Sequence, residues 1–419
     1  MDEFPRGQAL SNSNCQRGAA VKVCILSTGH QCLDDRLYYK ETSSIAKRHP
    51  VVLIAPCPGG HAPSHPNLEY RPLTLRSGLL ARIVALPKAL RMVRKARPAV
   101  VHIHDYELIL LVPLLKVLTG VKVIYDIWEA NYEMMAESKR LPRTVALAAA
   151  VVFRAIERHL CRYCDLIVTA DCEIAKAYRD VARVVVVKNY PIPALCTPDP
   201  ERLQSLRARY RDRRCVIYVG SMAEQRGLYL MLEIVALLRE KVPSVTLLLV
   251  GRLDNAQRDR VIRTIREKTL EPNVDVVGWV PFGDVANYIA ISEIGLIPFL
   301  RTAKFKKNIP QKQFEYMACG IPVVGTDLPP IAQYVREADC GRLVSQPRPE
   351  DFAKVLVSLL ENDAERRIMG LRGKQAVAEK WTWDKMEARL FEAYDELDAQ
   401  IRRRRTGSGR GQTRSLPSR

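Results

Sequence analysis

The sequence predicts an α/β protein with two domains, each built on a parallel sheet that helices cover. The chain has 419 residues, about twice the length of a usual domain. Short apolar runs alternate with helix-length segments, which is typical of parallel strands joined by crossover helices. Four prolines between residues 191 and 200 interrupt this alternation, which then starts again. We therefore expect two Rossmann-like domains that face one cleft at the carboxyl ends of their strands.

The first domain is expected at residues 20–190, after a flexible segment at 1–19. Its first apolar run ends at Ser27-Thr28-Gly29, a helical stretch follows at 35–48, and a second apolar run starts the next strand. The predicted strands of this domain are 21–26, 51–55, 99–104, 121–125, 166–170 and 184–187.

The second domain is expected at residues 212–400, after a semi-rigid linker at 191–211. Its predicted strands are 215–219, 245–250, 274–277, 294–297 and 323–325, with helices at 228–241, 255–270 and 312–318. After residue 351 the pattern is helical, and 381–400 reads as a closing helix that packs back across the domains. Residues 401–419, rich in Arg, Gly and Ser, are expected to form a disordered basic tail.

Composition excludes several classes of protein. Hydrophobic residues make up 47% of the chain and charged residues 26%, so it is neither disordered nor fibrous. Apolar runs stay shorter than the 18 or so residues that a membrane-spanning helix needs, and no secretory signal is visible. We therefore expect a cytoplasmic protein. Eleven scattered cysteines indicate reduced thiols, and the Cys161–Cys164 pair lacks a second pair at zinc-site spacing, so no metal is expected.

The net charge of +19 lies mainly in the first 190 residues (+10) and in the last 19 (+7). In the first domain, residues 77–98 read as an amphipathic helix that Pro87 kinks or splits. Leu79, Leu80, Ile83, Leu86, Leu90 and Val93 lie on one face, and Arg91, Arg94 and Lys95 form a basic stripe on the other. This pattern fits a helix at an anionic membrane surface, and a core-packed helix with a solvated basic face is the alternative. No basic motif interleaved with aromatics supports nucleic-acid binding.

Two motifs in the second domain point to an anionic ligand. Gly220 ends a predicted strand, and Arg226 and Gly227 lie where the following loop enters a helix, which favours a phosphate; an ordinary surface arginine after a turn is the alternative. Lys312 and Glu315 lie three residues apart and share a helix face. An ammonium can hold a diphosphate and a carboxylate can accept bonds from a ribose diol. A surface salt bridge is the alternative for this pair.

At this point the chain resembles family 4 of the glycosyltransferases, which are retaining enzymes of the GT-B fold, and it most resembles the branch that builds surface polysaccharides. In the second domain the matching runs are G-S-M-A-E-Q-R-G-L at 220–228, G-W-V-P at 278–281, I-G-L-I-P at 294–298 and P-Q-K-Q-F-E-Y-M-A-C-G-I-P-V-V-G-T-D at 310–327. In the first domain they are H-Q-C-L-D-D-R-L-Y-Y-K-E at 30–41, V-H-I-H-D-Y-E-L at 101–108 and K-N-Y-P at 188–191. The resemblance covers about residues 20–395.

The resemblance implies that Arg226 and Lys312 hold the donor diphosphate and neutralise its charge as the glycosidic bond breaks. They would replace the metal ion of other glycosyltransferase folds, so neither metal nor cofactor is expected beside a UDP- or GDP-sugar. Glu315 would bind the ribose. The other donor contacts implied are Gly29, His30, Gly220, Ser221, Gly227, Gly251, Trp279 and Val280.

The implied function is transfer of a sugar to a polysaccharide or lipid-linked acceptor at the cytoplasmic membrane face. Sugar or acceptor contacts would come from Asp34, His104, Trp128 and Glu129. The chain departs from the family pattern at Lys307, where a Glu is usual, and at Trp128, where a His is usual. These departures keep a catalytically impaired binding scaffold as an alternative. A sugar-nucleotide epimerase is a further alternative, which the P-x-K-x-x-E helix disfavours.

Overall fold

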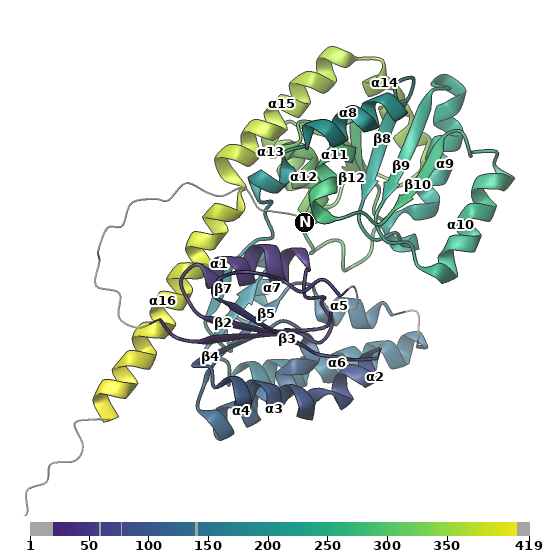
Figure 1. The fold of residues 1–419 in the computed structure, drawn as a ribbon. Coiled ribbons are helices and arrows are strands. Elements are labelled where there is room, and N and C mark those ends of the chain that lie inside the picture. Colours follow the sequence, from purple (N-terminus) through teal and green to yellow (C-terminus); the bar gives the residue numbers. More distant parts are fainter. Residues whose placement is uncertain (1–19, 58–59, 77, 139–140, 409–419) are drawn as a thin grey trace, which may run out of the picture.

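Two parallel sheets organise the computed structural model, which describes residues 20–57, 60–76, 78–138 and 141–408 (Figure 1). The first sheet has seven strands in the order β3-β2-β1-β4-β5-β6-β7, and the second has six in the order β10-β9-β8-β11-β12-β13. All the strand pairings within these sheets are parallel. The strand order reverses beside β1 in the first sheet and beside β8 in the second, and such reversal points are where doubly wound sheets bind ligands.

The strands of the first sheet are apolar runs, as the sequence predicts, except for one edge strand that it does not predict. Their bounds are β1 Val23–Leu26, β2 Val51–Ala55, β3 Leu68–Pro72, β4 Val100–Ile103, β5 Lys122–Ile127, β6 Leu166–Thr169 and β7 Val184–Val186. The predicted strands are buried apart from β7, at the other edge, which is half-buried. The unpredicted strand is β3, whose residues are half-buried or exposed, so it carries little of the apolar signal that marks a central strand.

The helices of the first domain lie on both faces of this sheet. Residues 35–46 form a π-helical segment, Asp35–Thr42, that continues into α1, Ser43–Ala46. A 3₁₀ segment, Tyr106–Leu111, leads into α4. The remaining helices are α2 Leu79–Val84, α3 Leu86–Ala96, α4 Val112–Thr119, α5 Asn131–Ala136, α6 Arg143–Cys161 and α7 Cys172–Lys176.

The predicted amphipathic helix at 77–98 is two helices, since α2 ends before Pro87 and α3 begins around it. α3 packs into the core through Leu86, Ala89, Val93 and Ala96, while its basic side chains face outward. None of the α2 residues is buried. The apolar side chains that were expected to share one face therefore separate into a buried set on α3 and an exposed set on α2.

The second sheet and its helices repeat this architecture. Its strands are β8 Arg214–Val219, β9 Val245–Val250, β10 Val274–Gly278, β11 Ile294–Ile297, β12 Val323–Thr326 and β13 Gly341–Val344, of which β13 was not predicted. Its helices are α9 Leu228–Lys241, α10 Asn255–Glu267, α11 Val285–Ala290, α12 Lys312–Ala318, α13 Pro329–Ala338, α14 Pro349–Leu360 and α15 Asp363–Lys380. The expected linker at 191–211 contains a 3₁₀ turn, Pro193–Cys196, and helix α8, Pro200–Arg209. Pro200 occupies the first turn of α8, where a helix tolerates proline, and Asp199 caps that helix.

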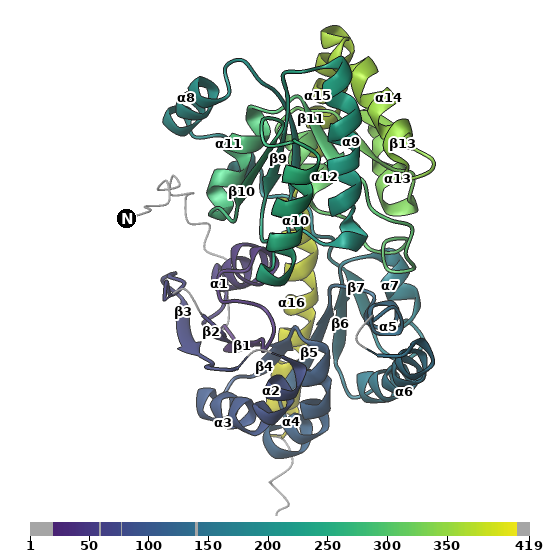
Figure 2. The ribbon, with the colours of Figure 1, turned by 90° about the vertical axis from the view of Figure 1, so that its right-hand side faces the viewer.

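The last helix, α16 Trp383–Ser408, runs from the second domain back along the first (Figures 1 and 2). Trp383 donates from Nε1 to Ser44 Oγ at 2.9 Å, and Tyr394 OH lies 3.0 Å from His102 Nδ1. The prediction of a closing helix is confirmed.

The start of the predicted disordered tail is wrong, because helix α16 continues to Ser408. Two features favour the continued helix: the side chain of Ile401 is buried, and Arg402 forms an ion pair at 2.6 Å with Asp398, one turn earlier. Residues 409–419 lie outside the described part of the chain, as does the predicted flexible segment 1–19. The domain bounds stay a prediction.

The described cysteines are all free, and Cys161 and Cys164 are buried. Burial raises the pKa of both thiols, that of Cys164 to about 12, so both are protonated at neutral pH. In the same described ranges, no helix is both long and apolar enough to cross a bilayer.

Candidate active site

Two cations converge on the loop that follows β8, at the reversal point of the second sheet. A Cβ built on Gly220, whose φ is +112°, would lie 3.4 Å from Lys312 Nζ and 3.9 Å from Arg226 Nη1. Glycine at this position therefore leaves open the space toward which both cations extend. Two cations beside one backbone turn form a site for a doubly charged anion.

The Lys312 ammonium lies between aromatic rings at the start of α12. Its Nζ is 4.8 Å from the centroid of the Tyr218 ring and 4.9 Å from that of Phe299. Burial, together with the charge of Arg226, lowers the pKa of Lys312 to about 7, although Glu315 opposes the shift. A bound anion would favour the charged form of this lysine.

Glu315 lies one turn further along α12 and is also buried. Its Oε1 accepts from Gln311 Nε2 at 2.8 Å, and Gln311 Oε1 accepts from Asn189 Nδ2 at 2.7 Å. Asn189 Oδ1 in turn accepts from Lys40 Nζ at 2.6 Å, so a chain of polar contacts joins α12 to the first domain. Burial raises the pKa of Glu315 to about 7, with a further contribution from the charge of Asp35.

The other predicted donor contacts follow neighbouring strands at the same edge of the sheet. Gly251, at the end of β9, has φ +141°, and a Cβ there would stand 2.1 Å from the carbonyl oxygen of Gly220. A Cβ on Gly227 would stand 2.2 Å from the carbonyl oxygen of Pro298. Both glycines are needed for close approach of two backbone segments. Ser221 and Trp279 are exposed and Val280 is half-buried, so the structure leaves them accessible but does not show a shared contact.

A carboxylate anchors the Gly29–His30 loop at the end of β1. Asp105 Oδ2 accepts from Ser27 Oγ at 2.7 Å, from Thr28 N at 2.8 Å and from Gly29 N at 3.0 Å. The imidazole of His30 lies 3.6 Å from Asp105 and, through its other nitrogen, 3.6 Å from Asp34. Burial alone would lower the pKa of His30, but these carboxylates together with Glu129 raise it. His30 is therefore protonated more readily than burial alone would allow.

The predicted sugar and acceptor contacts gather around Trp128. Its ring centroid is 3.8 Å from that of His30 and 5.4 Å from that of His104. The next residue, Glu129, pairs with Lys304 of the second domain at 2.6 Å. Although burial would raise the pKa of Glu129, the charges of Lys304, Arg226 and His30 lower it. The structure thus brings Glu129, Arg226 and His30 into one electrostatic environment that includes both domains.

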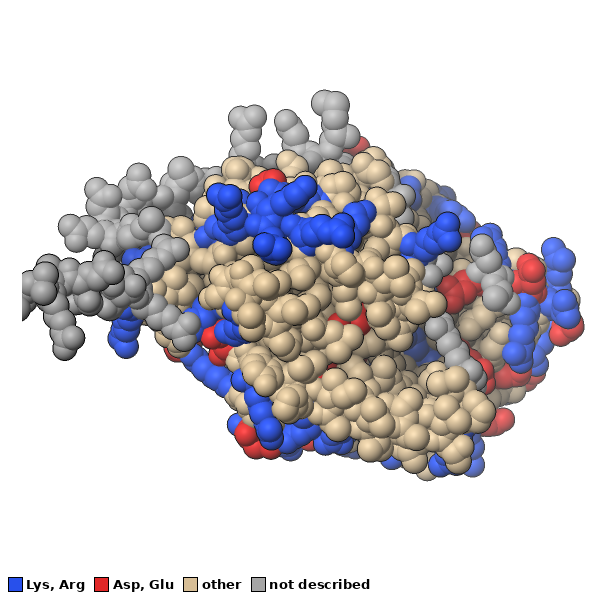
Figure 3. All heavy atoms as spheres, turned by 90° about the horizontal axis from the view of Figure 1, so that it is seen from below, with Lys and Arg blue, Asp and Glu red and all other residues tan. Residues whose placement is uncertain are grey.

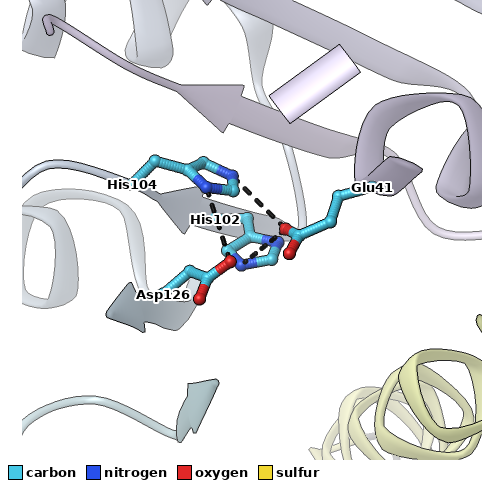
Figure 4. A group of neighbouring side chains, drawn as sticks. All are labelled: Glu41, His102, His104 and Asp126. Atoms are coloured by element: carbon cyan, nitrogen blue, oxygen red, sulfur yellow. Dashed lines mark ion pairs between the residues drawn. The ribbon is translucent and has the colours of Figure 1, made fainter. Parts of the chain in front are cut away.

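A buried ionic cluster is formed by side chains from the π-helical segment, the end of β4 and β5 (Figure 4). Potential ligand atoms of Glu41, His102, His104 and Asp126 lie within 4.8 Å of one another. Arg36 already contacts both carboxylates: its Nη2 is 2.8 Å from Glu41 and 3.0 Å from Asp126, and its Nη1 donates to Val187 O at 2.8 Å.

Charge balance favours a proton over a divalent cation in this cluster. With neutral imidazoles, one guanidinium and two carboxylates leave a single negative charge, which one proton neutralises and a divalent cation would invert. Burial, opposed by Arg36 and supported by Asp126, raises the pKa of Glu41 well above its usual value. Burial lowers the pKa of His102 to about 4 and also lowers that of His104, so both imidazoles are neutral.

Sequence reasoning missed several residues that build the site. Arg36, Asp105 and Glu107 lie inside the runs quoted for the resemblance but received no role, and Arg82 lies in none of them. Lys307, at the departure from the family pattern, forms an ion pair with Glu133 of the first domain. The sequence shows that these carboxylates and arginines lie close to predicted strand ends, which could have marked them as candidates. It does not show which carboxylate pairs with which arginine, because the partners are far apart in the sequence.

Comparison with known proteins identifies both halves of the chain. Residues 43–190 match the family described as "Glycosyl transferase 4-like domain", and residues 202–376 match "Glycosyl transferases group 1". A phosphatidyl-myo-inositol mannosyltransferase of Mycolicibacterium smegmatis is 26% identical over 190 residues, which are 45% of this chain and 46% of that protein. The chain therefore aligns with about half the length of this curated relative.

Solved structures share the fold over most of the chain. Sucrose-phosphate synthase from Thermosynechococcus elongatus superposes with a TM-score of 0.73 at 18% identity and covers 91% of this chain and 100% of its own. The Anabaena protein HepE, solved in complex with UDP and glucose, superposes with a TM-score of 0.70 at 15% identity and covers 90% and 99%. Taken together with the two family matches, these likenesses show that the chain belongs to glycosyltransferase family 4 and has its GT-B fold.

Proposed function

We propose that the protein is a retaining glycosyltransferase that moves a sugar from a UDP- or GDP-sugar to a polysaccharide or lipid-linked acceptor. The observation that carries the proposal is the convergence of Arg226 and Lys312 on Gly220. When the sugar leaves, the bond between its anomeric carbon and the phosphate oxygen breaks, and the diphosphate gains negative charge. Two fixed cations stabilise that charge, so transfer needs no metal ion.

Glu315 completes the donor site by accepting hydrogen bonds from the ribose hydroxyls. Its carboxylate is on the same helix as Lys312, one turn away. The neighbour HepE binds UDP, which supports a uridine nucleotide as the first donor to test. The name of the mannosyltransferase relative includes phosphatidyl-inositol, which supports an acceptor at a membrane. Such an acceptor would place the protein at the cytoplasmic membrane face.

The test is transfer or hydrolysis of radiolabelled nucleotide sugars in the presence of EDTA. Arg226→Ala and Lys312→Ala should each lower turnover on the order of 100-fold, since each removes a charge from the leaving group, and both variants should fold. Near wild-type turnover of Arg226→Ala would refute the phosphate assignment. Loss of activity in EDTA that Mg²⁺ restores would refute the metal-independent mechanism.

A binding scaffold without turnover is the second candidate, because Lys307 and Trp128 replace residues that are usual in the family. Lys307 pairs with Glu133, and Trp128 packs against His30, so both side chains have structural partners. If the protein is such a scaffold, UDP should bind with a measurable Kd while no donor is consumed. Epimerisation would instead appear as a changed sugar in the recovered nucleotide, and this outcome is read in the same assay.

A further inference from the structure

Helices α2, α4 and α6 lie at the end of the first domain that is remote from the second domain (Figures 1 and 2). Each of them exposes large apolar side chains. Leu80 and Val84 on α2 are 75% and 71% exposed, and Val117 on α4 is 83% exposed. We call this surface the apolar face; its most exposed large apolar side chains are Leu80 and Val84 on α2, Val117 on α4, and Val151 and Val152 on α6. A broad apolar patch that is exposed to water marks an interaction site.

Helix α6 orients its side chains opposite to the usual pattern of a surface helix. Its buried positions before residue 157 are the small residues Ala146 and Ala150, whereas Val145, Val151 and Val152 point outward. A helix that needed only to cover the sheet would bury its large apolar residues and expose polar ones. The outward face of α6 is therefore suited to an apolar environment.

The charge pattern identifies the partner as an anionic lipid surface. Residues 78–104, 108–125 and 141–156 contain no Asp or Glu. Figure 3 shows this face as a largely uncharged surface with a cluster of Lys and Arg side chains along one edge, and with further basic and acidic side chains at its other edges. The exposed basic residues of α3 are Lys88, Arg91, Arg94, Lys95 and Arg97. An apolar surface with a basic border fits lipid tails beneath anionic headgroups, whereas an apolar protein partner would not need the basic border.

Helix α2 connects the apolar face to the candidate active site. Between its exposed residues, Arg82 points inward, donating from Nη2 to Asp105 Oδ1 at 2.8 Å and from Nε to Glu107 Oε1 at 2.5 Å. Asp105 is the acceptor that holds the backbone of Thr28 and Gly29. The guanidinium also packs close to Gly29, where a Cβ would stand 2.6 Å from Arg82 Nη2.

We propose that the apolar face inserts into an anionic bilayer and that Arg82, as a positioning residue, couples this insertion to the Gly29–His30 loop. Arg82 and the loop backbone both donate to Asp105. A shift of α2 in the bilayer interface therefore moves the Arg82 guanidinium and, through Asp105, the loop. The docking stands independently of the activity, whereas the consequence for transfer rests on the proposed function. Docking through apolar side chains survives high salt, while attraction by the basic border alone does not.

The docking is tested by sedimentation of the full chain with vesicles of phosphatidylglycerol and phosphatidylcholine. Wild-type protein should bind at low salt and largely remain bound at about 1 M NaCl, where exposed charges are screened beyond about 3 Å. Leu80→Glu with Val151→Glu should weaken binding at least tenfold at both salts. Charge reversal at Arg91, Arg94 and Lys95 should weaken it chiefly at low salt.

The matched control places the same charges on the other domain. Ile368 and Leu371 on α15 are 50% and 67% exposed, so Ile368→Glu with Leu371→Glu should leave vesicle binding unchanged. Equal binding of the Leu80→Glu, Val151→Glu variant and the wild type would overturn the proposal. So would a wild-type protein that ignores vesicles and forms a dimer that the same variant dissociates, because the face would then join two copies of the chain.

The coupling is tested with Arg82→Gln, which keeps the apolar face intact. Trp128 lies 3.8 Å from His30, so its fluorescence, assigned by difference from Trp128→Phe, reports the loop. Vesicles should change this fluorescence in the wild type and raise transfer to a soluble acceptor analogue several-fold. Arg82→Gln should bind vesicles as the wild type does, without either response.

The two readouts separate the inference from the proposed function. A fluorescence response without any sugar transfer would refute the activity and leave the coupling intact. Transfer without a fluorescence response to vesicles, or a full response in Arg82→Gln, would overturn the coupling.

Discussion

Lys312 and Glu315 lie one turn apart on α12, and burial shifts their pKa values toward the same value, about 7, from opposite sides. Burial disfavours the charged form of each, which lowers the pKa of the amine and raises that of the acid. Their mutual attraction opposes both shifts. In the free protein, the charge state that binds a nucleotide diphosphate is therefore confined to a narrow range of pH.

The first prediction is a bell-shaped dependence of kcat/KM on pH with its maximum near pH 7. As pH rises through the pKa of Lys312, the ammonium that holds the diphosphate is lost. As pH falls through the pKa of Glu315, the carboxylate that accepts from the ribose is protonated, so both limbs descend close to neutrality. Initial rates from about pH 5.5 to about pH 9 measure the profile. Lys312→Arg should remove the alkaline limb, and a flat wild-type profile would contradict the prediction.

Glu315→Ala should chiefly raise the KM for the donor, since ribose contacts change little between ground state and transition state. Steady-state kinetics with a saturating acceptor separate the two constants. Lys312→Ala is the contrast, because it should lower kcat. An unchanged donor KM in Glu315→Ala would place the ribose site elsewhere.

Gly227→Ala should destabilise the loop that carries Arg226. The residue has φ +83°, which costs a non-glycine residue about 1–2 kcal/mol, and its Cβ would collide with the carbonyl of Pro298. We expect a lower free energy of unfolding in urea and a lower turnover. Gly283→Ala is the matched control, because its φ is not positive and its Cβ would meet no atom within 4 Å. Equal stability of the two variants would show that the loop adapts.

Most of the fold follows from local patterns in the sequence, since buried parallel strands are continuous apolar runs. The runs at 51–55, 245–250 and 294–297 match β2, β9 and β11 residue for residue. β3 and β13 escaped prediction because each pairs with only one neighbour at an edge and keeps exposed side chains. The edge strands β7 and β10 were predicted because their residues are mostly valine, so an edge position alone does not hide a strand.

The candidate site likewise has residues that local patterns predict and pairs of residues that they do not. Arg226 was identified from a strand-to-helix turn, and Lys312 and Glu315 from their spacing on one short helix. That Arg226 and Lys312 meet at Gly220 is visible only in the folded chain. The pairs of Arg36 with Asp126 and of Arg82 with Asp105 join residues 90 and 23 positions apart, and only the folded chain shows them. The exposed α2 was also hidden, because its apolar pattern resembles that of the core-packed α3.

Asp126→Asn should cost about 3–5 kcal/mol in the free energy of unfolding, because it removes the charge of one of the two carboxylates that contact the buried Arg36 guanidinium. Urea denaturation followed by circular dichroism measures the loss. Asp180→Asn is the control: this carboxylate pairs with Arg158 at the surface, so its removal should leave the unfolding midpoint unchanged. Comparable midpoints for the two variants would mean that the buried pair contributes no more than a surface pair.

The pair between Lys307 and Glu133 should help hold the two domains together. Lys307→Glu places two carboxylates face to face, so we expect a larger radius of gyration in X-ray scattering and a higher donor KM. The exchange Lys307→Glu with Glu133→Lys restores opposite charges and should recover both values, with a coupling energy of about 0.5–1 kcal/mol, since Lys307 is partly exposed. The same exchange at Lys176 and Glu173, a pair within the first domain, should change neither quantity. If the exchange at 307 and 133 leaves the variant as open as Lys307→Glu alone, the lysine acts on the sugar and not on closure.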